Sequence, residues 1–195
     1  MNLPYAEAAE QNKHVIYQAI SGYLAGDALE IGSGTGQHAV YFAGRSPAVS
    51  WQTSDLGAAL PGLEARIRSS GLDNLPPPIE LDVTGAWPPR KFALVYTANS
   101  LHIMSSAMVE ACFAGVGDCL QSGGVFAAYG PFNYQGEYTS PSNAGFDRML
   151  RSRDPSSGIK DYVWLTELAV AARLELLDDI EMPVNNRTLV WQKRT

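Results

Sequence analysis

Short apolar runs alternate along this chain with longer segments in which apolar residues recur every three or four positions. The short runs are typical of buried parallel strands, and the longer periodicity is typical of helices that pack on a sheet. We predict strands over residues 28–31, 49–53, 79–81, 92–97, 125–129, 174–182 and 188–193. We predict helices over residues 5–25, 37–43, 58–70, 105–120 and 165–172. The alternation indicates an α/β protein with a mostly parallel sheet.

The chain reads as one domain over residues 1–195, without a repeat, a low-complexity tract or a second domain boundary. Residues 1–25 predict an N-terminal helix that closes the site as a lid. Residues 131–160 are rich in Gly, Ser, Asn, Asp and Pro, and they predict a long structured loop inserted on the substrate side. A loop of this length in a small domain is more often functional than idle.

Residues 28–38, ALEIGSGTGQH, carry the clearest chemical signal. An apolar strand runs into three alternating glycines, and a helical pattern begins at Gln37. Glycine adopts positive φ and lets a ligand lie against the backbone, while the free N–H groups of a helix N-terminus face the same point. This combination predicts a nucleotide-binding loop.

The spacing of the glycines separates the classes of nucleotide. A dinucleotide fingerprint counted from Gly32 needs a glycine at position 37, and a P-loop needs a Gly-Lys-Ser/Thr ending that is absent. The pattern E-x-G-x-G-x-G instead resembles motif I of class I S-adenosylmethionine (SAM)-dependent methyltransferases. The alternative is a glycine turn without a ligand, which is common in α/β folds. The resemblance implies cofactor contacts from Glu30, Gly32, Ser33, Gly34, Gly36 and Gln37.

Two acids stand where predicted strands end. Asp55, followed by Leu56, can accept hydrogen bonds from both ribose hydroxyls, which both SAM and NAD carry. Asp82, followed by Val83, stands where the class I pattern places an acid facing the adenine amino group. Each acid also has a purely structural reading, since Asp55 fits a helix N-terminus and Asp82 fits a turn.

A polar run, Thr97-Ala98-Asn99-Ser100-Leu101-His102, follows the fourth predicted strand. We predict that Asn99 contacts the methionine part of the cofactor or the acceptor, and that His102 serves as a base; the alternative for His102 is a structural histidine. Methyl transfer demands alignment and, for some acceptors, the loss of one proton. Tyr129, at the end of the fifth strand, completes the predicted catalytic set.

The block after the fifth strand offers aromatic walls with a few directed polar groups, which suits a small, partly apolar ligand. The alternative is that its polar residues satisfy the backbone of a long loop. The predicted substrate-binding residues are Asn12, Tyr129, Phe132, Asn133, Tyr138, Asn143 and Arg148.

The net charge of −6 argues against a nucleic-acid partner, which would require a basic face. The one basic concentration, Arg148, Arg151, Arg153 and Lys160, is interleaved with acids and predicts local ion pairs. We expect two free buried thiols at Cys112 and Cys119, no signal peptide, no membrane span and no metal. These features favour a cytoplasmic monomer or homodimer that acts on a small molecule.

Several further blocks, among them Gly130-Pro131-Phe132-Asn133, Thr139-Ser140-Pro141-Ser142-Asn143 and Asp154-Pro155-Ser156-Ser157-Gly158-Ile159-Lys160-Asp161, resemble the class I methyltransferase family called domain of unknown function 938. This family includes methyltransferase-like protein 26, and the resemblance covers essentially the whole chain. It implies a Rossmann-like, seven-stranded, mostly parallel sheet with helices on both faces and a C-terminal antiparallel strand. It also implies SAM as cofactor and S-adenosylhomocysteine (SAH) as product.

Three functions stay open at this point. The first is a methyltransferase for an N, O or S atom of a small molecule. The second is a SAM-utilising enzyme in which the amino acid chain displaces methylthioadenosine, and the third is a SAM-binding module without catalysis. An NAD enzyme is a more distant possibility, because the glycine spacing opposes it.

Overall fold

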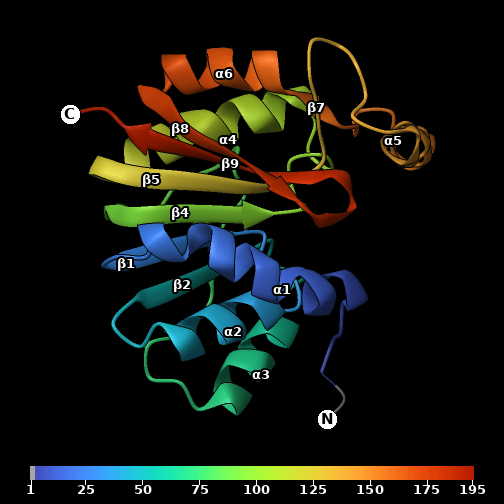
Figure 1. Cartoon of the computed structure of the whole chain (residues 1–195). Helices are drawn as coiled ribbons and strands as arrows, with labels where there is room; N and C mark the ends of the chain where they lie inside the picture. The colour runs from blue at the N-terminus through green and yellow to red at the C-terminus, as the bar shows by residue number, and fades with distance from the viewer. Residues whose placement is uncertain (1–2) are drawn as a thin grey trace.

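A seven-stranded sheet forms the centre of the molecule (Figure 1), and the computed structural model describes residues 3–195. The strand order is β3-β2-β1-β4-β5-β9-β8, with parallel pairing from β3 through β5 and antiparallel pairing of β9 with both β5 and β8. The strands are β1 Asp27–Ile31, β2 Ser50–Asp55, β3 Ile79–Glu80, β4 Phe92–Ala98, β5 Leu120–Gly130, β8 Leu174–Met182 and β9 Asn186–Lys193. The predicted fold class is confirmed.

Helices cover both faces of this sheet (Figure 1). On one face α1, α2 and α3 pack on the sheet around a core that includes Phe42 of α2 and the strand residues Trp51 and Tyr96. On the other face α4 and α6 pack on the sheet around Phe113 of α4 and the strand residues Phe126 and Trp191. The helices are α1 Glu7–Ile20, α2 Gln37–Arg45, α3 Leu60–Ser70, α4 Ser106–Cys119, α5 Pro141–Arg153 and α6 Tyr162–Ala171, with 3₁₀ turns at Ser21–Tyr23 and Pro183–Asn185. Strands covered on both faces explain why the parallel segments read as continuous apolar runs.

The centre of the sheet is also where its strand order reverses. β1 pairs with β2 on one side and with β4 on the other, so the connections after β1 and β4 leave toward opposite faces. The carboxyl ends of these strands therefore border a crevice, which is where open α/β sheets bind ligands.

The insertion over residues 131–160 is not the loop that its composition predicts. It contains the 13-residue helix α5 and a small parallel pair formed by β6 Phe132–Asn133 and β7 Lys160–Asp161. α5 begins in a well-formed cap, because the side chain of Ser140 accepts a hydrogen bond from the backbone N–H of Asn143 and Pro141 occupies the first helical turn. It lies beyond the carboxyl ends of the strands (Figure 1), so it forms part of the site's surroundings.

None of the helices within residues 3–195 is both long enough and apolar enough to span a bilayer. The longest, α1 and α4, have 14 residues each, whereas a helix that crosses the hydrocarbon core needs about 20.

Candidate functional site

The turn after β1 has the backbone geometry that its glycines predict. Gly32, Gly34 and Gly36 have φ values of 67°, 54° and 73°, a region that side chains other than glycine rarely adopt. A Cβ added at Gly32 would lie 2.7 Å from Oγ of Ser100. α2 starts directly after this turn at Gln37, so its free N–H groups lie at the same edge of the sheet.

A cavity of about 330 Å³ opens at this edge, between the turns that follow β1, β2, β3 and β4. Seven residues that the sequence analysis assigns to the cofactor line it: Gly32, Gly34, Asp55, Leu56, Asp82, Val83 and Asn99. Sequence reasoning missed the other lining residues: Ile31, Leu81, Ala98, Ser100, Ile103, Met104 and Met108. Apolar side chains thus supply much of the wall, and the directed polar groups are few, as in sites for small organic ligands.

The carboxylate of Asp55 can accept more hydrogen bonds than the two that the described residues donate to it. Its Oδ2 accepts a hydrogen bond from the backbone N–H of Gly34 at 2.6 Å, and its Oδ1 accepts from that of Leu56 at 2.7 Å. A carboxylate offers about four acceptor positions. These two bonds fix the side chain at the cavity and leave positions open for two hydroxyl groups of a ligand.

Asp82 is oriented by Thr84, whose backbone N–H and hydroxyl both donate to its Oδ1, at 2.9 and 2.7 Å. These bonds hold the pKa of the Asp82 carboxyl below its ordinary value, so it is ionised at neutral pH. Its Oδ2 keeps its acceptor positions for a donor such as an exocyclic amino group. Asp82 therefore both stabilises a local turn and lines the cavity.

Asn99 adopts a left-handed backbone, with φ of 56°, where β4 ends. Its N–H donates to the carbonyl of Tyr129 at 2.9 Å, which ties the ends of β4 and β5 together. Such backbone conformations cluster at binding sites, where the surrounding structure holds them in place.

Glu30 does not line the cavity. It is 2 % exposed and lies on the face covered by α1–α3, where its Oε2 accepts a hydrogen bond from Nε1 of Trp51 at 2.9 Å. The pKa of Glu30 is raised to about 7, mainly by burial and also by the Asp55 carboxylate, against the lowering effect of the Trp51 and Ser33 hydrogen bonds. Its cofactor contact stays a prediction.

Three further predicted cofactor residues do not line the cavity but pack around the glycine turn. Ser33 is buried, and its hydroxyl accepts a hydrogen bond from the backbone N–H of Ser54 at 3.2 Å. Gly36 lies against Leu63, whose Cδ1 would be 2.7 Å from an added Cβ. The side chain of Gln37 is buried and joins the turn to the N-terminal helix.

Gln37 links the start of α2 to the start of α1. Its Oε1 accepts from the backbone N–H of Ala6 at 2.7 Å, and its Nε2 donates to Oε2 of Glu10 at 2.8 Å. At the next residue of α2, Nε2 of His38 lies 2.7 Å from Oδ1 of Asn12. The amide oxygen of Asn12 can only accept, so this nitrogen of His38 carries the proton. These contacts place the N-terminal helix beside the glycine turn.

Tyr129 is buried where β5 ends, and its hydroxyl accepts a hydrogen bond from Nδ2 of Asn186 at 3.0 Å. Burial raises the pKa of Tyr129, partly offset by the Asn12 and Asn186 amides, so its hydroxyl is protonated at neutral pH. Tyr129 is therefore a hydrogen-bond donor and acceptor at this edge, and it is not a resident base.

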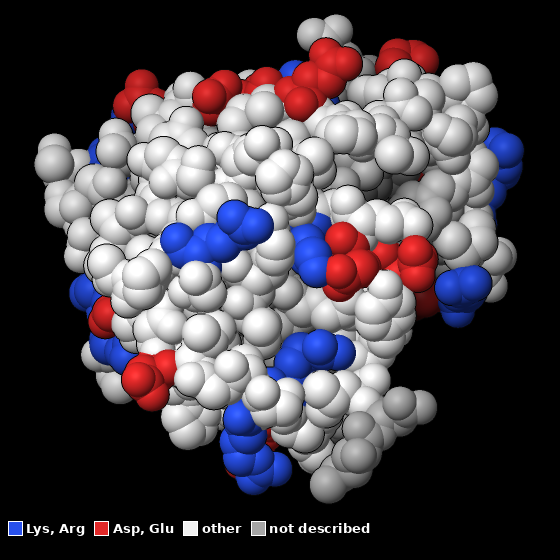
Figure 2. Space-filling model, turned by 60° about the horizontal axis from the view of Figure 1, so that its bottom comes forward, with Lys and Arg blue, Asp and Glu red and all other residues white. Residues whose placement is uncertain are grey.

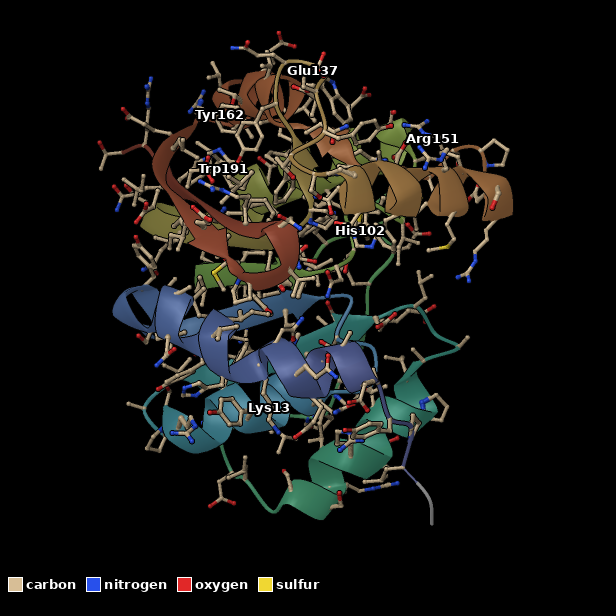
Figure 3. The ribbon with its side chains drawn as sticks, turned by 45° about the vertical axis from the view of Figure 1, so that its right-hand side comes forward. Lys13, His102, Glu137, Arg151, Tyr162 and Trp191 are labelled. Atoms are coloured by element: carbon tan, nitrogen blue, oxygen red, sulfur yellow. The ribbon has the colours of Figure 1, made fainter. Side chains whose placement is uncertain are left out.

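His102 lies beside α5 (Figure 3) and outside the cavity wall. Its ring packs edge-on against Phe146 with centroids 5.1 Å apart, and its backbone carbonyl accepts from the N–H of Gly158. Burial lowers the pKa of His102 to about 4, with a further contribution from the nearby Lys160. The imidazole is thus neutral at pH 7 and packed, which is the structural alternative for this residue; its catalytic role stays a prediction.

The remaining predicted substrate residues do not converge on one point. Phe132 is part of the core under α4, and Asn133 leaves its buried Oδ1 without a partner among the described residues. Asn143 is buried and donates to the carbonyl of Asn185 at 3.0 Å. Tyr138 and Arg148 are exposed. Asn143 thus lies between α5 and the turn that joins β8 to β9.

Charged side chains of both signs are interspersed on a largely uncharged face in Figure 2. In the basic segment at the end of α5, Arg151 pairs with Asp147 at 2.8 Å, as the interleaving of charges predicts. Lys160 instead donates to backbone carbonyls.

Several solved structures of similar fold are described as methyltransferases. An O-methyltransferase family protein from Burkholderia thailandensis superposes with a TM-score of 0.85 at 14% identity, over 96% of this chain and 57% of that one. Human N-acetylserotonin methyltransferase in complex with SAM superposes with a TM-score of 0.82 at 13% identity, over 97% and 53%. The mitomycin 7-O-methyltransferase MmcR superposes with a TM-score of 0.82 at 13% identity, over 95% and 54%. At these identities the likeness shows the fold, and this chain spans about half the length of each of these proteins.

A sequence profile described as "Protein of unknown function (DUF938)" matches residues 3–193. The match extends from the N-terminal helix through the glycine turn and the inserted α5 to the last strand, so it includes every element that borders the cavity. The chain therefore belongs to the DUF938 family.

Proposed function

We propose that this protein binds SAM in the cavity at the carboxyl edge of the sheet and transfers its methyl group to a small molecule. The observation that carries the proposal is the order of groups along one cavity: the glycine turn, the Asp55 carboxylate, and then Asp82 with Val83. A nucleoside needs an acceptor for its ribose hydroxyls and an acceptor plus apolar contacts for its base, in that order. The cavity provides both within about 330 Å³.

The cavity wall favours a nucleoside without phosphate. None of the described residues that line it is a lysine or an arginine, which a dinucleotide or nucleotide phosphate commonly requires. Met104 and Met108 give a polarisable apolar wall that suits a purine ring. These features support SAM over NAD.

When bound, SAM supplies an activated methyl group for an in-line displacement. Asn99 lies at the end of β4, close to both the glycine turn and Tyr129, and there it can orient the cofactor and the acceptor. Tyr129, held by Asn186, can donate its hydroxyl proton in a hydrogen bond to the acceptor. Alignment of this kind contributes much of the rate of a bimolecular displacement.

A small, uncharged acceptor fits this edge best. Beside Tyr129 the hydrogen-bonded side chains are neutral (Asn12, Tyr129, Asn143 and Asn186), whereas the acids Asp55 and Asp82 line the cofactor cavity. His102 is neutral as well, because of its lowered pKa. An acceptor bound here meets hydrogen-bonding groups without a fixed charge.

The proposal is tested first by calorimetric titration with SAM, SAH and NAD. We expect SAM and SAH to bind and NAD not to bind. Asp55→Ala removes the ribose acceptor and is expected to weaken SAH binding about tenfold or more, because hydrogen bonds to charged groups are strong. The matched control Asp118→Ala removes an exposed acid from α4, and it should leave SAH binding unchanged.

The reaction is tested by incubating the protein with methyl-labelled SAM and a set of small amines, phenols and thiols, followed by mass spectrometry. A labelled product with equal release of SAH supports methyl transfer. Release of methylthioadenosine would instead indicate displacement within SAM. Binding of NAD with no binding of SAM or SAH would refute the proposal as a whole.

A further inference from the structure

Three consecutive backbone carbonyls in the turn after β4 accept hydrogen bonds from one distant segment. The N–H of Gly158 donates to His102 at 2.9 Å, the hydroxyl of Ser157 donates to Ile103 at 2.8 Å, and Nζ of Lys160 donates to Met104 at 2.7 Å. We call residues 157–160 the clamp. Since Ile103 and Met104 line the cavity, the clamp fixes one of its walls.

We propose that Lys160 is a positioning residue of the cofactor site, which acts through the carbonyl of Met104 to set the cavity wall. The inference rests on the proposed function, because it takes this cavity to be the site of SAM. Lys160 itself does not line the cavity, so it is not a catalytic residue.

A lysine is a costly choice for this buried position. Lys160 is 7 % exposed, and within residues 3–195 no carboxylate lies within ion-pair distance of it. Its second bond goes to the carbonyl of Gly158, at 3.0 Å. An apolar side chain would fill the space without desolvating a charge. The ammonium therefore has a purpose that an apolar residue lacks, which is to bond two carbonyls of neighbouring turns at once.

The clamp is held in turn by α5. The N–H of Ile159 donates to Oδ1 of Asp147 at 2.6 Å, and Oδ2 of Asp147 accepts from Tyr138 and from Nε of Arg151, each at 2.8 Å. Figure 3 shows α5, with Arg151, directly beside His102. The insertion and the cofactor cavity are thus joined by a continuous hydrogen-bonded path, in which Lys160 makes the last step.

Because Lys160 is charged, the affinity for SAH should depend on pH. The pKa of Lys160 is lowered to about 8, mainly by burial and also by the positive charge of Arg151, against the carboxylates of Asp147 and Asp154. The nearby His102 is neutral above pH 7, because its own pKa is lowered to about 4. As the pH rises through 8, Lys160 loses its proton and its bonds to the carbonyls lose their charge assistance.

The test compares SAH binding by calorimetry in the wild type, Lys160→Met and Lys160→Arg. Methionine keeps the length and volume of the side chain without a donor, and arginine keeps the charge and donors. We expect Lys160→Met to raise the Kd for SAH about five- to twentyfold, because part of the free energy of the lost charged hydrogen bond is transmitted to the ligand through the cavity wall, and we expect substantial rescue by arginine. The wild-type affinity should fall from pH 7 to pH 9 more steeply than that of either variant.

Lys193→Met is the matched control. Nζ of Lys193 also donates to two backbone carbonyls, of Gly117 at 2.7 Å and of Ala172 at 3.2 Å, but it does so at the opposite edge of the sheet. This variant should lose stability and keep its affinity for SAH. Equal weakening by Lys193→Met, or unchanged binding by a folded Lys160→Met, would overturn the inference.

Two further measurements cover the other outcomes. If Lys160→Met does not fold, Ser157→Ala removes the neighbouring clamp bond to Ile103 and should weaken SAH binding by a smaller factor; unchanged affinity would count against the clamp. If the wild type does not bind SAH, the proposed function fails. The clamp is then tested without ligand, because hydrogen exchange over residues 101–104 must accelerate in Lys160→Met and not in Lys193→Met.

Discussion

Glu30 predicts an unusual dependence of stability on pH. Its carboxyl is fully buried beside Trp51, and its pKa is raised to about 7 from an ordinary value of 4.5. Below about pH 4.5 both the folded and the unfolded protein carry the proton. Between about pH 4.5 and 7 the unfolded chain releases the proton while the folded protein keeps it, so the free energy of unfolding falls as the pH rises. At 1.36 kcal/mol per pKa unit, the full effect is about 3 kcal/mol.

Glu30→Gln removes this dependence. The amide oxygen can still accept the Trp51 N–H, and the amide cannot ionise. The variant should match the wild type near pH 4.5 and exceed it by about 3 kcal/mol near pH 8. Urea unfolding followed by tryptophan fluorescence measures both proteins across this range, with Glu110→Gln on the exposed face of α4 as the matched control. A difference in stability that stays constant with pH would show that Glu30 titrates normally and would refute the burial argument.

Three further predictions concern stability and reactivity. Burial raises the pKa of Cys112 and of Cys119 to about 12, so neither thiol should react with Ellman's reagent in the native protein, and both should react in denaturant; a rapid native phase would contradict this. Gly115→Ala should cost about 1–3 kcal/mol in urea unfolding, because its Cβ would lie 2.0 Å from Cε2 of Trp87, whereas Gly22→Ala, with nothing within 4 Å, should be neutral or stabilising. Val184→Asn should raise the free energy of unfolding by about 0.5–1 kcal/mol, because Val184 is 82% exposed and has a φ of 61°, a conformation that asparagine tolerates better than valine. A loss of stability would show that the valine side chain makes a stabilising contact.

The architecture could be predicted from the sequence because it depends on local patterns. Apolar runs of strand length, glycine turns and helical periodicity each report on neighbouring residues, and their order along the chain restricts the topology to few choices. The cavity-lining glycines and acids could be located for the same reason. Residues at the carboxyl ends of adjacent parallel strands must meet at one edge of the sheet.

The role of a side chain could not be predicted from the sequence where a distant partner decides it. Gln37 follows the glycine turn in sequence, yet its amide bonds to Ala6 and Glu10 on α1. Glu30 faces Trp51 because the two strands pair in one particular register, which the sequence does not reveal. The role proposed for Lys160 likewise depends on the hydrogen bond from its Nζ to the carbonyl of Met104, which the sequence does not reveal.

α5 was missed for a different reason. Its polar composition resembles that of a loop, and its apolar face is narrow, since Asn143, Asp147 and Leu150 are its buried residues. The signal that was present is Ser140 followed by Pro141, a typical helix start. For α5 the N-cap is therefore a better predictor of the helix than hydrophobic periodicity.

The attachment of the first residues beside the glycine turn has a practical consequence for handling the protein. Pro4 packs against Gly62, and its carbonyl accepts a hydrogen bond from Arg66, while Ala6 bonds to Gln37. The segment from Pro4 to Ala6 is thus held against α3 and the start of α2, next to the glycine turn. The C-terminus lies at the opposite end of the sheet (Figure 1). Binding and turnover are best measured on protein tagged after Thr195, or with an N-terminal tag removed.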